Sequence, residues 1–169
     1  METIVRTQRL ALRAWTMEDA DEMFAIYRDP RVWRYLSPSP DYADLAATRA
    51  RLATSIETIA KRGYGHWALV ENDGGALVGS CGFRAGFEEK ELEVGFTIAP
   101  SRWGRGYATE IAGAVVELGF KHFGAPRIWS LTSPANLPSL KVLEKIGMRY
   151  VKDLAEDGAT WAVYARTAP

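Results

Sequence analysis

Two glycines, Gly104 and Gly106, mark the stretch of this sequence that is best suited to chemistry. The residues before them, 91–98, alternate between polar and apolar side chains as a half-buried strand does. The apolar residues after them recur at helical spacing. A glycine turn that opens a helix exposes free N–H groups at the positive end of the helix dipole, and phosphate is the usual ligand there. The sequence therefore predicts an anion site.

The two most familiar phosphate-binding motifs do not describe this turn. A Walker loop needs a Gly-Lys-Ser or Gly-Lys-Thr triplet, and the chain contains none. The dinucleotide fingerprint needs a third glycine where Thr109 stands, and an acidic ribose ligand about 20 residues further on is not evident. A nucleotide-dependent enzyme is therefore disfavoured, while a turn that only starts a helix remains the structural alternative.

Residues 103–110 of this turn read Trp-Gly-Arg-Gly-Tyr-Ala-Thr-Glu. Through Trp103, Gly106 and Ala108 they resemble the pyrophosphate loop of the GNAT acetyltransferase superfamily, Gln/Arg-x-x-Gly-x-Gly/Ala, although Trp103 departs from its first position. The whole stretch is similar to the ribosomal-protein N-terminal acetyltransferase (RimJ/RimL-like) branch. This resemblance implies acetyl-CoA as the cosubstrate. The residues that it implies in cofactor binding are Phe96, Thr97, Ile98, Trp103, Gly104, Arg105, Gly106, Tyr107, Ala108 and Thr109.

A second stretch with a family likeness runs from residue 133 to residue 148. Asn136 lies three residues before Ser139, and Leu-Glu-Lys-Ile-Gly-Met follows at 143–148, which is similar to the fourth conserved block of the GNAT superfamily. The resemblance implies that the Asn136 side chain hydrogen-bonds the pantetheine arm of CoA. The same amide suits a helix cap equally well. Together with the glycine turn about 30 residues upstream, we favour the role in CoA binding.

Transfer of an acyl group to an amine requires a deprotonated amine, a polarised thioester carbonyl and a proton for the leaving thiolate. Many GNAT enzymes supply that proton from a Tyr seven residues after the Asn, but Leu143 stands there. The resemblance instead implies Ser139 as the acid and as a cofactor contact, with Tyr150 and Tyr164 as reserve donors. A solvent-facing or backbone-bonded serine is the alternative for Ser139.

Glu93 is the candidate for the base that deprotonates the amine. It lies in the strand that leads into the glycine turn, just before Val-Gly-Phe, where the resemblance places a recurrent glutamate. Burial beside a cleft would raise the pKa of such a carboxyl toward neutrality. A structural glutamate that bonds strand-end amides is the alternative. Glu91 shares the face of Glu93 and is the second candidate, assigned here to acceptor binding.

The acceptor is expected near Trp33 and Tyr35, on the connector between the first two helices, because the resemblance implies that this region covers the substrate. Carboxylates and aromatic rings suit an amine beside an apolar body. An α-amine has a pKa of about 7.7–8.0, against about 10.4 for a lysine side chain, and it loses its proton more easily. We therefore favour a peptide N-terminus or a small amine as the acceptor.

Direct transfer in a ternary complex is the expected reaction, because Cys81 has no basic neighbour that would make it a nucleophile. The alternative is a CoA-binding sensor or interaction module on the same fold, which would bind CoA without turnover. Transfer of a longer acyl group would use the same loop, so the sequence leaves the acyl length open.

Composition bounds the remaining possibilities. The 169-residue chain carries 21 basic and 21 acidic side chains, so no bulk charge favours nucleic acid or an anionic membrane. A single cysteine rules out an intrachain disulfide and a cysteine-based zinc site, and with two histidines no metal is expected. The chain has neither an apolar run near the roughly 20 residues of a membrane span nor the apolar core of a signal peptide. A cytoplasmic monomer or homodimer is expected.

The elements that position these residues follow from periodicity and turn chemistry. Thr16 to Asp19 is a capping-box pattern that opens the first helix, and a second helix runs from a cap at Asp41 to Gly63. The expected strands cover 9–15, 66–70, 77–83, 91–98, 128–132, 149–152 and 160–165, later helices cover about 107–123 and 137–146, and loops fall at 37–40, 72–75, 88–90 and 156–158.

This order of elements predicts one α+β domain over residues 1–169. Hairpins in the middle of the chain require antiparallel pairing, and the helix between strands 91–98 and 128–132 implies one parallel pair. We expect a mixed, mostly antiparallel central sheet of about seven strands with helices on both faces. The order matches that of the GNAT-like acyl-CoA N-acyltransferase fold, so the resemblance extends over nearly the whole chain.

Overall fold

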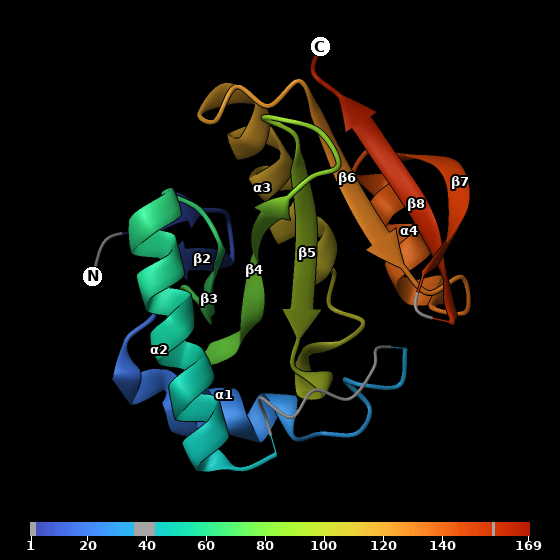
Figure 1. The fold of residues 1–169 in the computed structure, drawn as a ribbon. Coiled ribbons are helices and arrows are strands. Elements are labelled where there is room, and N and C mark those ends of the chain that lie inside the picture. Colours follow the sequence, from blue (N-terminus) through green and yellow to red (C-terminus); the bar gives the residue numbers. More distant parts are fainter. Residues whose placement is uncertain (1–2, 36–42, 157) are drawn as a thin grey trace.

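The computed structural model describes residues 3–35, 43–156 and 158–169, which fold around one eight-stranded sheet (Figure 1). The strands follow the order β1-β2-β3-β4-β5-β6-β8-β7 across the sheet. The expectation of about seven strands missed the first, a four-residue strand that pairs with the second. The strand bounds are β1 Thr3–Arg6, β2 Leu10–Arg13, β3 His66–Glu71, β4 Leu77–Ala85, β5 Leu92–Ile98, β6 Arg127–Thr132, β7 Arg149–Glu156 and β8 Ala159–Thr167.

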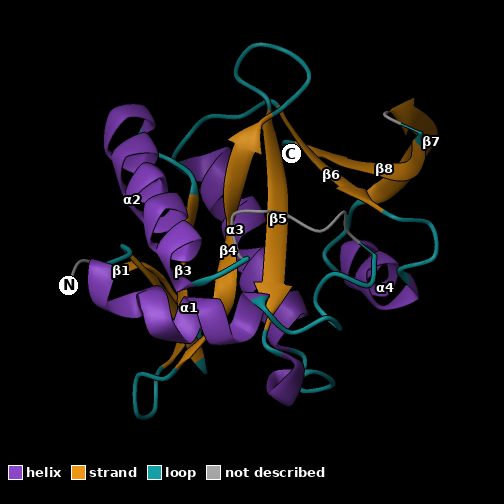
Figure 2. Cartoon of the chain, turned by 60° about the horizontal axis from the view of Figure 1, so that its bottom comes forward, coloured by secondary structure: helices purple, strands orange, loops and turns teal. Residues whose placement is uncertain are grey.

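Helices cover both faces of this sheet, as predicted. Figure 1 shows α1 and α2 in front of the sheet and α3 and α4 behind it, and Figure 2 shows α1 crossing the sheet beside α2. Within the described residues, no helix is both long enough and apolar enough to cross a lipid bilayer. The helix bounds are α1 Ala20–Tyr27, α2 Leu45–Arg62, α3 Tyr107–Lys121 and α4 Leu137–Lys145.

The start of α2 differs from the expectation. The predicted cap, Asp41, and the predicted loop 37–40 lie outside the described residues. Asp44 is the N-cap instead, because its carboxylate accepts a hydrogen bond of 2.8 Å from the backbone N–H of Ala47. The helix ends as predicted at Gly63, whose φ of +78° lies in the left-handed region that glycine tolerates best.

Other local predictions hold. The Asp19 carboxylate accepts the Thr16 N–H at 2.8 Å, which is half of the predicted capping box before α1. The turn at residues 72–75 joins β3 and β4 as an antiparallel hairpin. Gly147 follows the last turn of α4 at a φ of +81°, as predicted. Asn136 is the N-cap of α4, which was the alternative to its predicted role in CoA binding. Of the predicted turn at 156–158, Asp157 lies outside the described residues.

Two apolar clusters hold the layers together, one on each face of the sheet. Ile111 and Val115 of α3 pack with Val94 of β5 in the larger cluster, and all three side chains are at most 1% exposed. Met23 of α1 and Leu52 of α2 pack in the smaller cluster on the opposite face. The alternation of apolar residues along the strands, with period two, assigns side chains to these two faces.

The sheet splits between β5 and β6, its one parallel pair. The two strands pair at Leu92 with Ile128 and at Glu93 with Trp129, and the structure forms no further pair between them in its described residues. Figure 1 shows the strands diverging toward the end of β5. Beyond Glu93, the β6-facing edge of β5 therefore has no strand partner in the described residues.

Candidate active site

The glycine turn lies directly after the open edge of β5 and starts α3. Gly104 and Gly106 have φ values of +75° and +78°, a left-handed conformation that side chains other than glycine adopt at a cost. Gly106 is the N-cap of α3, and its carbonyl accepts the N–H of Glu110 at 3.0 Å. The N–H groups of the first turn, at residues 107–109, lack acceptors within the helix. The predicted anion site therefore has the required backbone geometry.

Side chains behind the turn hold it in place. The Tyr107 side chain is buried, and its hydroxyl donates to Glu71 at 2.7 Å. Arg102 donates to both oxygens of the same carboxylate, at 2.8 and 3.0 Å, and this bond holds the pKa of Glu71 below its usual value. Of Tyr107, only the backbone therefore faces the anion site. Glu71 and Arg102 lie in separate elements, so their contact with the turn does not follow from the sequence pattern.

Trp103, which stands at the Gln/Arg position of the family pattern, contacts the end of β5. Its indole N–H donates to the carbonyl of Ile98 at 2.7 Å, and half of the residue is exposed. The ring thereby fixes the turn to the strand and occupies one carbonyl of the open edge. An exposed tryptophan beside the turn also offers an apolar surface to a bound ligand.

The backbone groups along the open edge belong to alternate residues of β5. Ala99 donates its N–H to the carbonyl of Val78, which continues the ladder with β4. Because antiparallel ladders alternate, the backbone of Thr97 also faces β4, whereas Phe96 and Ile98 face the gap toward β6. Of the three residues expected to offer backbone groups to a cofactor, two therefore lie on the open edge, and the backbone of Thr97 belongs to the ladder with β4.

The second predicted motif starts α4, which lies on the same side of the sheet as α3 (Figure 1). The side-chain oxygen of Asn136 accepts the N–H of Ser139 at 3.3 Å, so Asn136 caps the helix. This bond uses the amide oxygen and leaves the amide N–H₂ group for a ligand. The Ser139 side chain is half-buried in the first helical turn, and its hydroxyl has no hydrogen-bond partner among the described residues.

Glu93 lies on the face of β5 that points away from α3. The helices α1 and α2 cover this face on other strands of the sheet. Its side chain is 21% exposed, and one carboxylate oxygen lies 4.0 Å from Nη1 of Arg84 on β4. Burial raises the pKa of Glu93, and the charge of Arg84 offsets part of the effect. A carboxyl with a raised pKa is suited to accept a proton from an amine.

Glu91, the second acidic candidate, is buried and engaged. Its carboxylate accepts the indole N–H of Trp129 at 2.6 Å and the backbone N–H of Glu88 at 3.2 Å. Arg127 lies 3.8 Å from its other oxygen. These partners hold the turn between β4 and β5 together. In the structure, Glu91 therefore stabilises this turn. Its role in binding the acceptor stays a prediction.

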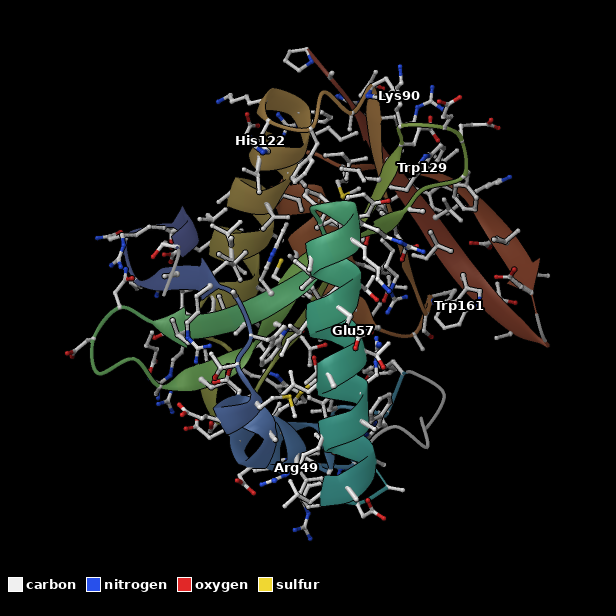
Figure 3. All side chains as sticks on the ribbon, turned by 60° about the vertical axis from the view of Figure 1, so that its left-hand side comes forward. Arg49, Glu57, Lys90, His122, Trp129 and Trp161 are labelled. Carbon is white, nitrogen blue, oxygen red and sulfur yellow. The ribbon has the colours of Figure 1, made fainter. Side chains whose placement is uncertain are left out.

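Aromatic side chains lie on the same face as Glu93. Figure 3 shows Trp129 of β6 and Trp161 of β8 on the side of the sheet where α2 lies. Trp33 and Tyr35, the predicted acceptor residues, lie just after α1. The Trp33 indole N–H donates to the backbone carbonyl of Tyr27, and the centroids of the Trp33 and Tyr27 rings are 6.2 Å apart. Both predicted rings are half-buried. The face therefore combines one carboxylate with several ring surfaces.

His66 lies on the same face as Glu93 and was not expected there from the sequence. Its imidazole lies on Gly95 of β5, between the positions of Glu93 and Thr97 on the same face. Burial, helped by the charges of Arg84 and Arg51, lowers the pKa of His66 to about 3, so the ring is neutral. Gly95, a glycine inside a strand, was the available signal, because such a glycine marks a close approach by another group.

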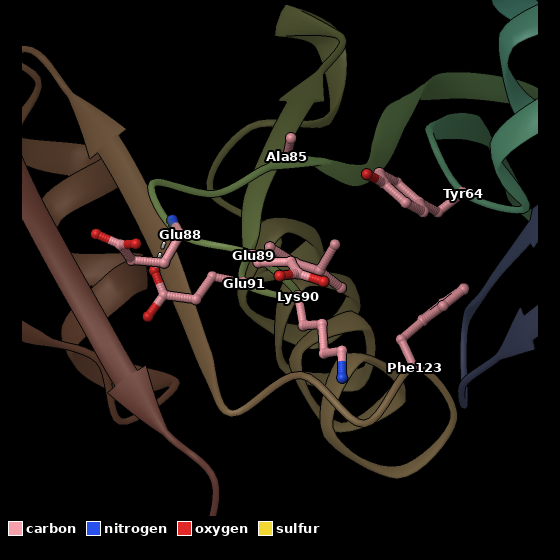
Figure 4. Close-up of a pocket in the computed structure, with 8 residues that line it drawn as sticks. Tyr64, Ala85, Glu88, Glu89, Lys90, Glu91 and Phe123 are labelled. Carbon is pink, nitrogen blue, oxygen red and sulfur yellow. Dashed lines mark hydrogen bonds between the residues drawn. The ribbon is translucent and has the colours of Figure 1, made fainter.

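Two other features lie apart from this site. A surface hollow of about 250 Å³ lies near Tyr64, Phe123 and the turn at residues 88–91 (Figure 4). It adjoins the start of β5, whereas the glycine turn follows the end of that strand, roughly 20 Å away. Cys81 is fully buried, and burial raises the pKa of its thiol well above the usual range. Neither feature contributes to the anion site.

Comparison with known proteins assigns a family to this geometry. The sequence pattern described as "Acetyltransferase (GNAT) domain" matches residues 9–149. An uncharacterized N-acetyltransferase of Bacillus subtilis, YoaA, is 31% identical over 155 residues, which cover 88% of this chain and 84% of that protein.

Solved structures give the same result. An acetyltransferase (GNAT family) from Bacillus anthracis superposes with a TM-score of 0.84 at 25% identity, covering 96% of this chain and 97% of that one. RimL, a ribosomal L7/L12 α-N-protein acetyltransferase solved in complex with coenzyme A, has the same fold, with a TM-score of 0.85 at 19% identity and coverage of 99% and 98%. The chain belongs to the GNAT family of N-acetyltransferases.

Proposed function

We propose that this protein transfers the acetyl group of acetyl-CoA to a primary α-amine, on a peptide N-terminus or a small molecule. The observation that carries the proposal is the junction of two features on one strand. The edge of β5 opens beyond Glu93, and the glycine turn with its free N–H groups follows at the end of the same strand. A thioester arm along the edge and a pyrophosphate at the turn would bind as one continuous ligand.

The cofactor would be held mainly by backbone groups. N–H groups of residues 104–109 would bind the pyrophosphate, and Arg105, which is exposed, would add a positive charge. Phe96 would offer backbone groups to the pantetheine arm, as an added half-strand does in strand-addition complexes. The amide N–H₂ group of Asn136 would bind the same arm. The complex of RimL with coenzyme A supports this assignment by analogy of fold.

In the proposed reaction, the lone pair of the amine attacks the thioester carbonyl carbon. The N–C bond forms and the C–S bond breaks, so the acetyl group passes directly to the amine. Glu93 takes the proton that the amine nitrogen loses. Ser139 supplies the proton that the thiolate gains, and CoA leaves as the thiol. Solvent then returns a proton to Ser139 and takes the proton from Glu93, so the enzyme is restored. Cys81 takes no part, because it is fully buried and its pKa is raised.

An α-amine suits this site better than a lysine side chain does. Arg84 lies near Glu93, so a second positive charge gains less there than it would beside an isolated carboxylate. An amine with a pKa of about 7.7–8.0 is partly neutral at pH 7, whereas lysine at about 10.4 is almost wholly charged. RimL, whose fold is similar, is an α-N-protein acetyltransferase, which is consistent with this choice.

The test is an acceptor panel with acetyl-CoA and detection of the free thiol of CoA. The panel contains matched peptides, one with a free N-terminus and an acetylated lysine, the other with an acetylated N-terminus and a free lysine, together with small α-amines. We expect thiol release with the free N-terminus or a small α-amine. A clear preference for the lysine side chain would overturn the α-amine assignment. Binding of CoA by calorimetry, without turnover of any amine, would favour a CoA-binding sensor instead.

A further inference from the structure

The imidazole of His66 occupies the place where a side chain of residue 95 would be. A Cβ atom at Gly95 would lie 2.8 Å from Cε1 and 3.1 Å from Nε2 of His66, which is too close for the ring to stay where it is. Side chains at 93, 95 and 97 share one face of β5. The ring edge that carries Nε2 therefore lies over the backbone of β5, between Glu93 and Thr97.

Within the described residues, Nε2 of His66 is a buried side-chain nitrogen that has no hydrogen-bond partner. Buried polar atoms are nearly always paired, so an unpaired one calls for an explanation. The buried hydroxyls of Tyr27 and Ser80 are bonded to each other at 2.7 Å. The indole of Trp15 bonds the backbone carbonyl of His66 at 2.7 Å, which fixes the main chain and leaves the ring nitrogen unsatisfied.

We propose that His66 is an acceptor-binding residue, whose Nε2 accepts a hydrogen bond from the amine as the amine attacks the thioester. This role rests on the proposed function. The ring of His66, from β3, lies over Gly95 of β5, and Glu93 precedes Gly95 on the same face of that strand. The open edge of β5 is the proposed place of the thioester. An amine that donates one N–H to Nε2 and another to Glu93 is held with its lone pair free to reach the carbonyl carbon.

His66 orients the amine and does not take its proton in this scheme. The ring stays neutral near pH 7, because its pKa is about 3, and such a nitrogen is too weak a base to keep a proton from an amine. A neutral imidazole carries one N–H and one lone pair, so acceptance at Nε2 requires the N–H at Nδ1. The proton of the amine passes to Glu93 as before.

The kinetic test compares His66→Leu, His66→Gln and His122→Leu in the full-length enzyme. His122 is the second of the two histidines, is exposed, and lies beside Phe123, so its variant controls for loss of an imidazole. For His66→Leu we expect kcat/KM for the acceptor to fall roughly tenfold, the loss of one hydrogen bond, with an unchanged KM for acetyl-CoA. His66→Gln, which can accept a hydrogen bond, should recover part of the loss.

Thermal unfolding without substrates separates this role from a structural one. A structural hydrogen bond would make His66→Leu less stable, whereas removal of an unpaired nitrogen should leave the melting temperature unchanged or raised. If the leucine variant does not fold, Gly95→Ala provides a second test, because the added methyl group pushes the ring from its place. It should weaken the acceptor in the same way while His66 is still present.

A spectroscopic readout uses the His122→Leu protein, in which His66 is the only histidine left. Nitrogen NMR should show a shift of Nε2 when the best amine of the acceptor panel is added with CoA, and no shift with its N-acetylated form. The possible failures are distinguishable. If no amine of the panel is acetylated, the proposed function fails and this role fails with it. If amines are acetylated but His66→Leu keeps the wild-type kcat/KM, only the role of His66 is overturned.

Discussion

Arg9 and Glu110 are joined by three contacts although they lie 101 residues apart. The guanidinium reaches Oε2 of Glu110 through Nε at 2.7 Å and through Nη2 at 2.6 Å, and the backbone N–H of Arg9 donates to Oε1 at 2.9 Å. Arg9 also donates to the carbonyl of Arg105, inside the glycine turn, at 2.8 Å. One side chain thus connects the first turn of α3, the glycine turn and the loop between β1 and β2.

This connection solves an electrostatic problem of the anion site. Glu110 lies in the first turn of α3, where its charge would repel a phosphate. Although burial acts to raise it, the pKa of Glu110 is lowered by hydrogen bonds from Thr7 and Arg9, so the carboxylate is charged. The guanidinium of Arg9 balances that charge beside the turn.

Replacement of Arg9 by Gln should therefore weaken CoA binding. The variant loses the bond to the Arg105 carbonyl and leaves the Glu110 charge unbalanced near the phosphate. We expect CoA affinity to fall roughly tenfold or more, as loss of a charged hydrogen bond usually does, with little change in the KM of the acceptor. Calorimetric titration with CoA measures this. Arg6→Gln is the control, because Arg6 lies on the same β1–β2 hairpin as Arg9 but bonds Asn72, in the turn after β3, at 2.9 Å. Equal losses in both variants would contradict the assignment.

Replacement of Gly106 by Val should block the approach of phosphate to the turn. The residue has a φ of +78°, so a β-branched side chain is strained there, and its Cβ would stand 3.5 Å from Nη2 of Arg9, on the side chain that holds the turn. We expect CoA binding to become too weak for calorimetry to detect. A folded Gly106→Val protein with wild-type CoA affinity would show that the loop assignment is wrong.

The matched control is Gly124→Val, because Gly124 also has a positive φ, of +62°, and a Cβ there meets no atom within 4 Å. Both variants should lose about 1–2 kcal/mol of stability from the same backbone strain. Only the Gly106 variant should lose CoA affinity, which separates the ligand effect from the loss of stability.

The features of this site that depend on residues close together in the chain were predicted from the sequence. Gly104 and Gly106 after an alternating strand predicted the turn and the start of α3, because turn chemistry and periodicity act over a few residues. The role of Asn136 as a helix cap was likewise within reach. The start of α2 was missed, because Asp41 and Asp44 are both acids before the same apolar pattern and only the Asp44 contact decides between them.

The contacts between distant residues that hold the site together could not be predicted from local sequence patterns. Arg9 and Glu110 lie in separate elements, as do His66 and Gly95, and neither pair follows from spacing along the chain. Pairings of this kind follow from sheet order and register, which single-sequence patterns leave open. Gly95 was a partial exception, because glycine within a strand indicates a close neighbour without telling which residue it is.

Replacement of Glu93 by Gln should slow the reaction without weakening the cofactor. Gln keeps the shape of the side chain but accepts no proton. Loss of a general base costs about 10²–10⁴ in rate, so we expect kcat to fall within that range while the KM of acetyl-CoA stays constant. Measurement requires conditions in which chemistry limits turnover. A wild-type kcat would mean that the amine needs no base from the protein, and that Glu93 is structural.

The same variant makes a prediction about stability and pH. Burial raises the pKa of Glu93, so the folded state binds more protons than the unfolded state between the two pKa values. The free energy of unfolding contributed by Glu93 therefore falls as pH rises through that window. We expect Glu93→Gln to melt higher than the wild type at pH 7, with a smaller difference near pH 4.

In the control for this prediction, the melting temperature should change in the opposite direction. The bond from Arg166 to Glu117, 2.8 Å long, lowers the pKa of Glu117, so its contribution to stability is present above its unfolded pKa and is lost as pH falls. Glu117→Gln should accordingly melt lower than the wild type at pH 7. If the Glu93 and Glu117 variants shift in the same direction, burial of Glu93 does not set its pKa.

Replacement of Ser139 by Ala tests the donor for the leaving thiolate. The substitution removes the hydroxyl but keeps the backbone N–H that bonds Asn136, so the cap of α4 survives. We expect kcat to fall by about 10²–10⁴ and the affinity for CoA to change little, because an acid acts in the transition state and not in ground-state binding. Ser55→Ala removes a hydroxyl that bonds within α2 and should leave kcat unchanged. If the Ser139→Ala enzyme keeps the full kcat when chemistry limits turnover, Ser139 has only a structural role in the first turn of α4, and solvent is the source of the proton.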